Sequence, residues 1–308
     1  MRACIDIGGT KVSVSLNDPA QPMVLRALRR EGTAHSGDAG ALARQVVRMV
    51  DEACVEAGVL PAAVLAAGVA APGPFVLVDG ATELATPNIC GGLAQAQGRL
   101  ANDWTRVPLE APLLRRFARV RIENDGIAAL EAERRWGALR GVDHGAYVTW
   151  STGVGCGLCV GGVVLRGKQG NAGHLGHIFV SDDADAVCGC GNVGDLEALV
   201  GGANLERRFG EPAEMLLGRA AEGDPRAVAV VDELCRVMGR ALYAITALGD
   251  LQRISLGGGV FLNNQALLLP RLQAQLRGRL PAMTDGCELV PAGLGERVGD
   301  YAALALLD

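Results

Sequence analysis

Two of the four histidines in this chain lie three residues apart, and a pair of cysteines follows them closely. His174 and His177 stand in the stretch NAGHLGH, and Cys188 and Cys190 enclose a single glycine. Imidazole nitrogen and thiolate sulfur are good zinc ligands, whereas neutral histidines also form hydrogen bonds with polar substrates. The stretch 171–191 therefore allows a metal site, a substrate site or both, and nothing inside it decides between them.

Two glycine-rich turns, DIGGTK at 6–11 and STGVGCG at 151–157, each join two apolar segments. Glycine lets backbone N–H groups approach an anion closely, and neither turn has the spacing of the P-loop. Two unrelated hairpins are the simpler interpretation of either turn alone, but the pair favours nucleotide binding. Asp6 could orient a magnesium-bound water, and the predicted phosphate-binding residues are Asp6, Gly8, Gly9, Thr10, Lys11, Thr152, Gly153 and Gly155.

The elements that must position these turns alternate between strands and helices. Hairpins are predicted at 3–16 and 146–165, which suggests a duplicated architecture, and buried strands at 64–71 and 253–256. One helix is predicted from Asp38, as its N-cap, to near Gly58, and another from Asp224-Pro225 to Gly249. A new strand near Val120 suggests a lobe boundary at residue 117. A last helix at about 296–307 is expected to pack back on the first lobe.

Composition and charge narrow the class of protein. The 308 residues are 49% hydrophobic with 43 glycines, which is typical of a globular α/β protein. A net charge of −5 without a basic run argues against nucleic-acid binding. The early Asp6 excludes a signal peptide, and no apolar run reaches the roughly 18 residues of a membrane span. Nine cysteines without a secretory signal indicate a reducing cytoplasm.

The motifs resemble, in order and over nearly the whole chain, those of the ROK family of sugar kinases in the actin-like ATPase superfamily. The resemblance implies an α/β, two-lobed, actin-like or ribonuclease H-like ATPase fold with the active site in the cleft between the lobes. The lobes would be 1–117 and 118–293, with a C-terminal helix at 294–308 returning to the first. It rests on DIGGTK, GVAAPGP (68–74), TPNICGG (86–92), ENDGIAALEAE (123–133), STGVGCG, AGHLGH (172–177), CGCGNVGDLE (188–197) and SLGGGV (255–260).

The resemblance assigns catalysis to Asp125, as the base that takes the proton of the attacking sugar hydroxyl. The plainer alternative, that Asp125 only caps the following helix, is compatible with this role. Asn124 and Asn88 would bind sugar hydroxyls, and Gly257, Gly258 and Gly259 would back the adenine. The family often has a further Asn where this chain has Ile127, so one minor contact would be missing.

The family pattern also interprets the histidine and cysteine stretch. Its Glu-x-x-His and C-x-C-G-x-x-G-C-x-E segments hold a structural zinc and touch the sugar. His177, Cys188, Cys190 and Glu197 match that pattern, with His177 as both zinc ligand and sugar contact and Glu197 as a sugar contact. Asp195 replaces the third cysteine and would be the fourth zinc ligand, since zinc also accepts carboxylate oxygen. A metal-free loop with two free thiols is the alternative.

His174 stands where the family usually has a glutamate, and this replacement is similar to bacterial N-acetylmannosamine kinases. The sequence therefore predicts an ATP- and Mg²⁺-dependent kinase that phosphorylates the 6-hydroxyl of N-acetylmannosamine, with His174 facing the sugar. A glucose or N-acetylglucosamine kinase is the alternative, and a sugar-responsive regulator or a non-catalytic sugar-binding protein of the same family is the alternative of another class. Sugar and ATP are the expected partners, without nucleic acid or membrane, in a cytoplasmic homodimer with one structural Zn²⁺.

Overall fold

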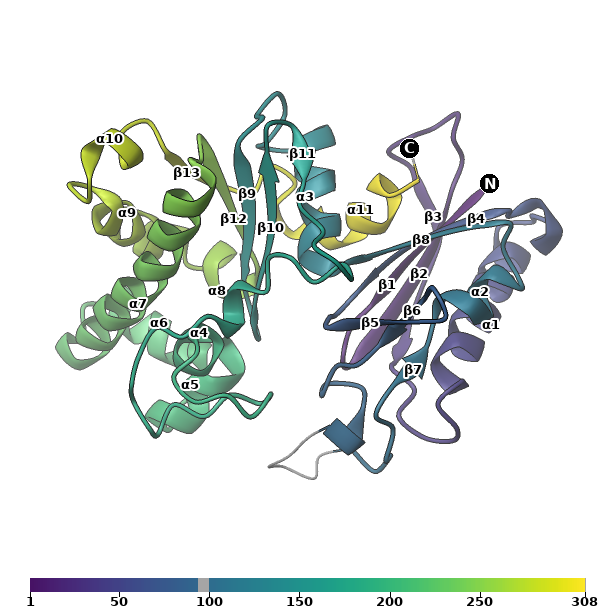
Figure 1. Ribbon diagram of the computed structural model, residues 1–308, viewed down its shortest axis with the longest axis horizontal. Helices are drawn as coiled ribbons and strands as arrows, with labels where there is room; N and C mark the ends of the chain where they lie inside the picture. The colour runs from purple at the N-terminus through teal and green to yellow at the C-terminus, as the bar shows by residue number, and fades with distance from the viewer. Residues whose placement is uncertain (94–99, 308) are drawn as a thin grey trace. The chain divides into compact units, whose positions relative to one another are not determined.

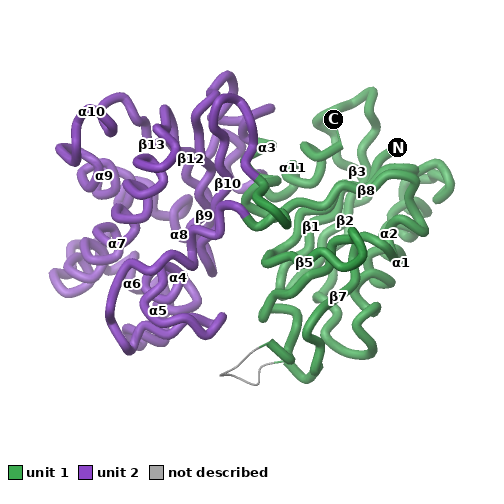
Figure 2. Tube along the Cα trace, viewed as in Figure 1, with its two compact units in different colours: residues 1–132, 166–171, 299–308 green, residues 133–165, 172–298 purple. Residues whose placement is uncertain are grey.

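The computed structural model describes residues 1–93 and 100–307 (Figure 1). The chain forms two compact units, coloured separately in Figure 2. Unit 1 comprises residues 1–132, 166–171 and 299–308, and unit 2 comprises residues 133–165 and 172–298. The first change of unit follows Ala132 rather than residue 117, because the strand expected to open the second lobe pairs with the first sheet.

The main sheet of unit 1 has the strand order β3-β2-β1-β4-β8. β2 runs antiparallel to both β1 and β3, whereas β1, β4 and β8 are parallel to one another. A smaller three-stranded antiparallel sheet has the order β5-β6-β7. The strands are β1 (Arg2–Ile7), β2 (Lys11–Asn17), β3 (Leu25–Gly32), β4 (Ala66–Ala71), β5 (Phe75–Val78), β6 (Ala81–Leu84), β7 (Val107–Pro108) and β8 (Arg119–Asn124).

Unit 2 repeats this pattern of strand directions in the order β11-β10-β9-β12-β13. β10 runs antiparallel to β9 and β11, and β12 lies parallel to both β9 and β13. The duplicated architecture predicted from the two hairpins is therefore confirmed at the level of the sheets. The strands are β9 (Gly145–Trp150), β10 (Val154–Val160), β11 (Val163–Val164), β12 (Arg253–Gly257) and β13 (Glu288–Pro291).

The helices cover the sheets (Figure 1). In unit 1 they are α1 (Ala41–Glu56), α2 (Glu110–Leu114) and α11 (Val298–Ala305), with short 3₁₀ turns at Pro61–Ala63 and Gly91–Leu93; α3 (Asp125–Trp136) begins there and ends in unit 2. Unit 2 has α4 (Leu196–Val200), α5 (Gly202–Phe209), α6 (Ala213–Ala221), α7 (Pro225–Gly249), α8 (Gly259–Leu262), α9 (Gln265–Leu276) and α10 (Pro281–Thr284), with 3₁₀ turns at Leu175–His177 and Gly295–Arg297. None of the helices in the described residues is long and apolar enough to span a membrane.

The two helices predicted from apolar spacing are confirmed, although one predicted cap is wrong. α7 begins as expected, because the Asp224 side chain accepts hydrogen bonds from the Arg226 and Ala227 N–H groups, both at 2.9 Å. α1 buries its apolar stripe, but Gly40 rather than Asp38 is its N-cap. The Asp38 carboxylate instead accepts from the Gly40 N–H, one residue before the helix.

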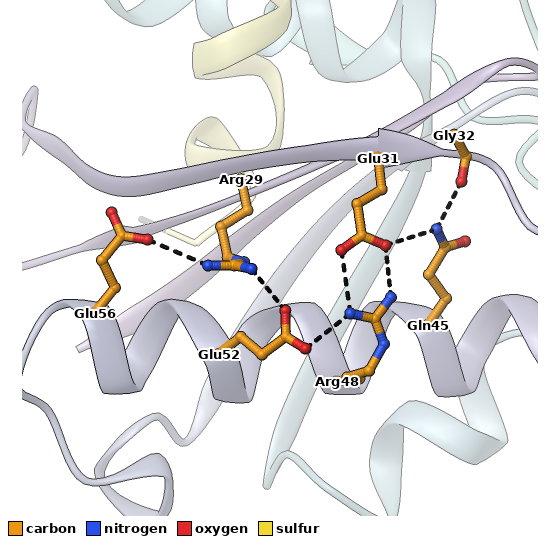
Figure 3. Close-up of polar contacts among 7 residues, drawn as sticks. All are labelled: Arg29, Glu31, Gly32, Gln45, Arg48, Glu52 and Glu56. Atoms are coloured by element: carbon orange, nitrogen blue, oxygen red, sulfur yellow. Dashed lines mark hydrogen bonds and ion pairs between the residues drawn. The ribbon is translucent and has the colours of Figure 1, made fainter.

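Polar side chains join α1 to β3 (Figure 3). The Arg48 guanidinium binds both oxygens of Glu31, at 3.1 and 2.5 Å. The Gln45 amide donates to the Gly32 carbonyl at 2.7 Å, and its oxygen accepts from the Ala34 N–H at 2.9 Å. Exposed ion pairs contribute only about 0–1 kcal/mol each. The network therefore adds little stability, and its main effect is that Gln45 fixes the position of the segment that follows β3.

The C-terminal helix α11 packs on the sheet of unit 1. A side chain at Gly68 would lie only 2.1 Å from the Ala303 carbonyl oxygen, so β4 and α11 approach each other through backbone. The Tyr301 hydroxyl donates to the Met23 carbonyl, and Arg2 donates to the Leu307 carbonyl. The segment that precedes α11 is anchored in unit 2, where the buried Glu133 carboxylate of α3 accepts from the Gly293 and Leu294 N–H groups.

Strand direction gathers the predicted motifs at one edge of each sheet. In unit 1, Asp6 of β1 pairs with Ala70 of β4, and Ala70 pairs with Glu123 of β8. Parallel strands end at the same edge, so the first glycine turn, the loop after β4 and the Asn124-Asp125 pair lie together. In unit 2, Gly257 pairs with Thr149, which places the triple glycine at the end of β9, where the second glycine turn starts.

Candidate functional site

The first glycine turn lies against residues 86–92 of unit 1, the predicted sugar loop that carries Asn88. The Gly8 N–H donates to the Lys11 carbonyl at 2.8 Å and closes the turn between β1 and β2. A side chain at Gly9 would lie 2.9 Å from the Asn88 Cβ, which is closer than real Cβ atoms approach. Glycine is therefore required at this position, because it allows Asn88 to reach the turn.

Two acidic side chains interact at the same edge of the sheet. Burial, followed by the negative charge of Asp125, raises the pKa of the partly buried Asp6 carboxyl from 3.8 to about 7. The positive charge of Lys11 acts in the opposite direction. A carboxylate that is costly to ionise beside a second carboxylate favours a cation nearby. These residues therefore fit the vicinity of a magnesium ion.

Asp125 is the first residue of α3, and its side chain is exposed. The Gly126 N–H donates to Asn124 Oδ1 at 3.0 Å and to Asp125 Oδ1 at 2.8 Å. The buried Asn124 thus supplies a capping bond to the second residue of the helix, so the helix does not depend on Asp125 alone for its cap. Ile127 is fully buried, so it makes no polar contact at this site.

The second glycine turn lies against Glu197 in unit 2. The Val154 N–H donates to Glu197 Oε2 at 2.9 Å, and a side chain at Gly153 would lie only 2.4 Å from the same oxygen. Burial raises the pKa of the Glu197 carboxyl, whereas the Val154 hydrogen bond lowers it. One predicted sugar-binding carboxylate and one predicted phosphate loop are therefore in direct contact.

The triple glycine at the end of β12 meets the backbone at the end of β9. A side chain at Gly258 would lie 2.4 Å from the Trp150 carbonyl oxygen, and the residue has φ +86°. Both features require glycine at this position. The predicted residues Thr152, Gly153 and Gly257 to Gly259 therefore belong to one edge of the unit 2 sheet.

Four side chains of unit 2 form a compact group with the composition of a metal site. One ligand atom from each of His177, Cys188, Cys190 and Asp195 lies within 4.8 Å of all the others. His177 Nδ1 lies 3.1 Å from Asp195 Oδ2, and Cys190 Sγ lies 3.6 Å from each of these two atoms. Tetrahedral zinc with bonds of about 2.0–2.3 Å places its ligands roughly 3.3–3.8 Å apart. The His177, Cys190 and Asp195 atoms therefore have nearly the spacing that such an ion needs, and Cys188 Sγ lies slightly further out, 4.0 Å from His177 Nδ1.

Asp195 replaces a cysteine of the family pattern and has two roles. Its side chain is completely buried, and Oδ1 accepts a hydrogen bond from the Ala198 N–H at 2.8 Å, which caps α4. Oδ2 faces His177 and Cys190. The hydrogen bond with Asp195 is the main cause that raises the pKa of His177 to about 10. This anionic environment is one that a bound cation would neutralise.

His174 lies beside this group. Its ring centroid is 6.1 Å from that of His177, and both residues are partly buried. The turn that carries them packs closely on β10, because a side chain at Gly173 would lie 2.3 Å from the Cys156 carbonyl oxygen. Gly173 also has φ +85°, so glycine is required before His174.

Sequence reasoning did not identify the residues that support the first turn. The Thr33 hydroxyl donates to the Gly8 carbonyl at 2.7 Å, and His35 Nε2 lies 2.8 Å from the Gly9 carbonyl. Asn102 donates to the Ile89 carbonyl of the predicted sugar loop at 3.1 Å. These residues lie outside the recognised motifs, and only the rarity of histidine in the chain could have drawn attention to His35.

Comparisons with known proteins agree with the motifs. The profile of the ROK family matches residues 2–308. The glucokinase of Aeropyrum pernix is 30% identical to this chain, over 98% of this chain and 95% of its own length. An N-acetylmannosamine kinase of Escherichia coli is 37% identical, over 47% of this chain and 51% of its own length.

Solved structures show the same fold. A ROK glucokinase of Streptomyces griseus, in complex with glucose and AMPPNP, matches 99% of this chain and 97% of its own chain, with 27% identity and a TM-score of 0.71. A ROK transcriptional regulator matches 99% of this chain and 77% of its own, with 22% identity and a TM-score of 0.77, which compares the fold alone. The predicted α/β fold of the actin-like ATPases is therefore confirmed.

The raised pKa of Asp6 predicts a pH-dependent effect of the substitution Asp6→Asn. Because the folded-state pKa of about 7 exceeds the ordinary value of 3.8, wild-type Asp6 destabilises the fold progressively as the pH rises through this window. Asn cannot ionise. The stability of Asp6→Asn relative to wild type should therefore increase from pH 4 to 7 and level off above it, in protein free of nucleotide and Mg²⁺.

Thermal unfolding of both proteins at a series of pH values measures this difference. Asp79→Asn, the same chemical change at an exposed turn between β5 and β6, is the control and should show no such trend. A constant difference between Asp6→Asn and wild type from pH 4 to 8 would contradict the raised pKa.

Proposed function

Since the chain belongs to the ROK family, we propose that it is an ATP- and Mg²⁺-dependent sugar kinase that transfers the γ-phosphate to the 6-hydroxyl of a hexose or N-acetylhexosamine. The observation that carries the proposal is the exposed Asp125 carboxylate beside Asp6, at the sheet edge that also bears the first glycine turn. A kinase needs a base and a phosphate-binding turn close together.

In this proposal Asp125 accepts the proton of the sugar hydroxyl as that oxygen attacks the γ-phosphate. The N–H groups of the first turn and Thr10 hold phosphate oxygens, and Lys11 offers a positive charge. Bound Mg²⁺ would neutralise phosphate charge, with Asp6 orienting one of its waters. In unit 2, Thr152, Gly153 and Gly155 are the second group of phosphate ligands, and Gly257 to Gly259 back the adenine.

The sugar would be held by Asn88 and Asn124 of unit 1 and by His174, His177 and Glu197 of unit 2. The buried Asn124 uses Oδ1 for the capping bond to Gly126, so its amide N–H₂ is the group proposed for the sugar. Glu197 would bind the sugar through its second carboxylate oxygen, because Oε2 accepts from the Val154 N–H and holds the second turn.

Two sugars are equally supported by the relatives. The glucokinase match extends over almost the whole chain, whereas the N-acetylmannosamine kinase match covers about half of it. We propose N-acetylmannosamine first because His174 replaces the family glutamate, and glucose or N-acetylglucosamine as the alternative. An imidazole offers a hydrogen-bond donor and an acceptor, whereas a carboxylate offers acceptors only.

A non-catalytic or regulatory role is the alternative of another class, because the family includes a transcriptional regulator. The exposed Asp125 and the two intact glycine turns favour catalysis. The homodimer and the cytoplasmic location stay predictions of the sequence.

The role of Asp125 predicts that Asp125→Asn lowers kcat by at least about 100-fold, the lower range for a positioned general base. ATP binding should persist, because the phosphate-binding turn is unchanged. Coupled ADP release gives kcat, and calorimetry gives the affinity for Mg-AMPPNP. Asp79→Asn is the matched control with wild-type turnover. Near wild-type kcat in Asp125→Asn would refute the assignment of the base.

The His177, Cys188, Cys190 and Asp195 group predicts one zinc ion per chain, measured by elemental analysis of protein purified without chelator. Asp195→Asn keeps an oxygen that can cap α4 but loses the carboxylate ligand. It should therefore release zinc faster to a chelator, and its zinc-free form should unfold at nearly the same temperature as zinc-free wild type. Asp195→Cys should retain zinc more tightly, because thiolate is the softer ligand. A zinc content near zero in fully active wild-type protein would rule out the site.

His174 predicts the sugar preference. A buried polar group left unpaired by the wrong sugar costs about 1–3 kcal/mol, or roughly 5- to 150-fold in kcat/KM. His174→Glu should therefore shift preference from N-acetylmannosamine toward glucose-configured sugars and lower activity on the native substrate. The measurement is kcat/KM for N-acetylmannosamine, N-acetylglucosamine and glucose, with His144→Glu as control. Unchanged ratios, or a wild-type preference for glucose, would contradict this assignment.

A further inference from the structure

Three carbonyl oxygens of the first glycine turn, those of Gly8, Gly9 and Thr10, are bound from one segment. The Gly8 oxygen accepts from the Thr33 hydroxyl at 2.7 Å, and the Thr10 oxygen accepts from the Thr33 N–H at 3.1 Å. The Gly9 oxygen lies 2.8 Å from His35 Nε2, which must carry the hydrogen because a carbonyl oxygen can only accept. Thr33 and His35 follow β3 directly.

This arrangement determines where the N–H groups of the turn point. In a planar trans peptide, the carbonyl oxygen and the N–H of the next residue point in opposite directions. Binding the Gly8 and Gly9 oxygens on one side therefore directs the N–H groups of Gly9 and Thr10 to the other side. Those are the groups that a phosphate would need.

The segment that carries His35 is itself held at several points. Gln45 of α1 binds the Gly32 carbonyl and the Ala34 N–H, as described above. Asn102 Nδ2 donates to the His35 carbonyl at 3.1 Å. The imidazole therefore extends from a fixed backbone toward the Gly9 carbonyl.

Asn102 also holds the predicted sugar loop. Its Nδ2 donates to the Ile89 carbonyl at 3.1 Å, and its Oδ1 accepts from the Gly91 N–H at 2.8 Å. One side chain thus binds the backbone on both sides of Cys90, next to Asn88, and the backbone of His35. Since Asn88 contacts Gly9, the phosphate turn and the sugar loop share a single hydrogen-bonded framework.

The equivalent turn of unit 2 is supported differently. Its Ser151 and Thr152 carbonyls accept from the N–H groups of Gly202 and Ala203, at 2.8 and 3.0 Å. Those bonds come from backbone at the start of α5, so no side-chain substitution removes them. In unit 1, a single substitution can remove one support of the turn and leave the backbone path unchanged.

We propose that His35 is a positioning residue that orients the phosphate-binding N–H groups of the first turn, and that Asn102 couples this turn to the sugar loop. The inference rests on the proposed kinase function. It assigns His35 an effect on nucleotide binding without contact with the sugar. It assigns Asn102 an effect on both substrates.

The experiment measures the Kd of Mg-AMPPNP by calorimetry without sugar, together with kcat and both KM values from ADP release. His35→Ala should weaken Mg-AMPPNP binding by about 3- to 10-fold, the effect of one net intramolecular hydrogen bond. His35→Gln should stay close to wild type, because its amide N–H can replace Nε2–H. Asn102→Ala should raise the KM of both ATP and the sugar. His144→Ala, the same change outside the site, is the control.

Thr33→Val and Thr33→Ser provide a second pair that does not depend on the folding of His35→Ala. Valine keeps the shape of threonine but removes the bond to the Gly8 carbonyl, so it should weaken Mg-AMPPNP binding, and serine should restore it. Thermal unfolding shows that each variant is folded.

The proposal is overturned if folded His35→Ala and Thr33→Val bind Mg-AMPPNP as wild type does, or if His35→Gln loses as much affinity as His35→Ala. An effect of Asn102→Ala on only one substrate would overturn the coupling. Failure of the proposed function looks different. Wild type that binds Mg-AMPPNP but releases no ADP with any sugar is not a kinase, yet its Kd values still test His35. Wild type without nucleotide affinity would overturn both.

Discussion

The burial of one carboxyl group beside another is the constraint on which the proposed site depends. Asp6 lies near the end of β1 and Asp125 directly follows β8, and the parallel strands between them keep both at one edge of the sheet. Burial and the neighbouring charge of Asp125 make ionisation of Asp6 costly and raise its pKa to about 7. The protein maintains this unfavourable pair at the end of its central strands, where a cation bound with a phosphate would relieve it. Electrostatic strain of this kind is typical of functional sites.

The two units each have a glycine turn at the corresponding place in the sheet, but different groups support the two turns. Each turn follows the first strand of its hairpin. In each turn, carbonyl oxygens accept hydrogen bonds from residues elsewhere in the same unit. In unit 2 the donors are the backbone N–H groups at the start of α5, whereas in unit 1 they are Thr33 and His35, which follow β3. The sheets themselves share strand order and direction. The two units therefore share their sheet architecture and differ locally in how each turn is supported.

Asp195 illustrates how a departure from a family pattern can be accommodated. A cysteine could provide a softer metal ligand, but it could not offer one oxygen to the group of His177, Cys188 and Cys190 and a second oxygen to the first turn of α4. The buried carboxylate does both. Glu133 likewise binds several groups at once: its buried carboxyl group accepts hydrogen bonds from Ser255 and from the backbone N–H groups of three other residues. Both of these buried carboxyl groups accept several hydrogen bonds, as buried polar groups generally must.

The sequence by itself determined the features that depend on neighbouring residues. Short stretches of sequence are enough to predict the glycine turns, the Asp224 cap and the apolar stripe of α7. Hydrogen bonds within a turn or helix join residues only a few positions apart. The motif order also determined the family and, with it, the fold. Tertiary structure alone decided the rest. His35 and Asn102 support the first turn from loops that carry no motif. Ile127 is buried, and Asp195 contacts both α4 and His177. The chain changes unit after Ala132 because β8 pairs with β4. Contacts between residues far apart in the chain leave no periodic or spaced signal in a single sequence, since either partner alone is an ordinary polar or apolar residue.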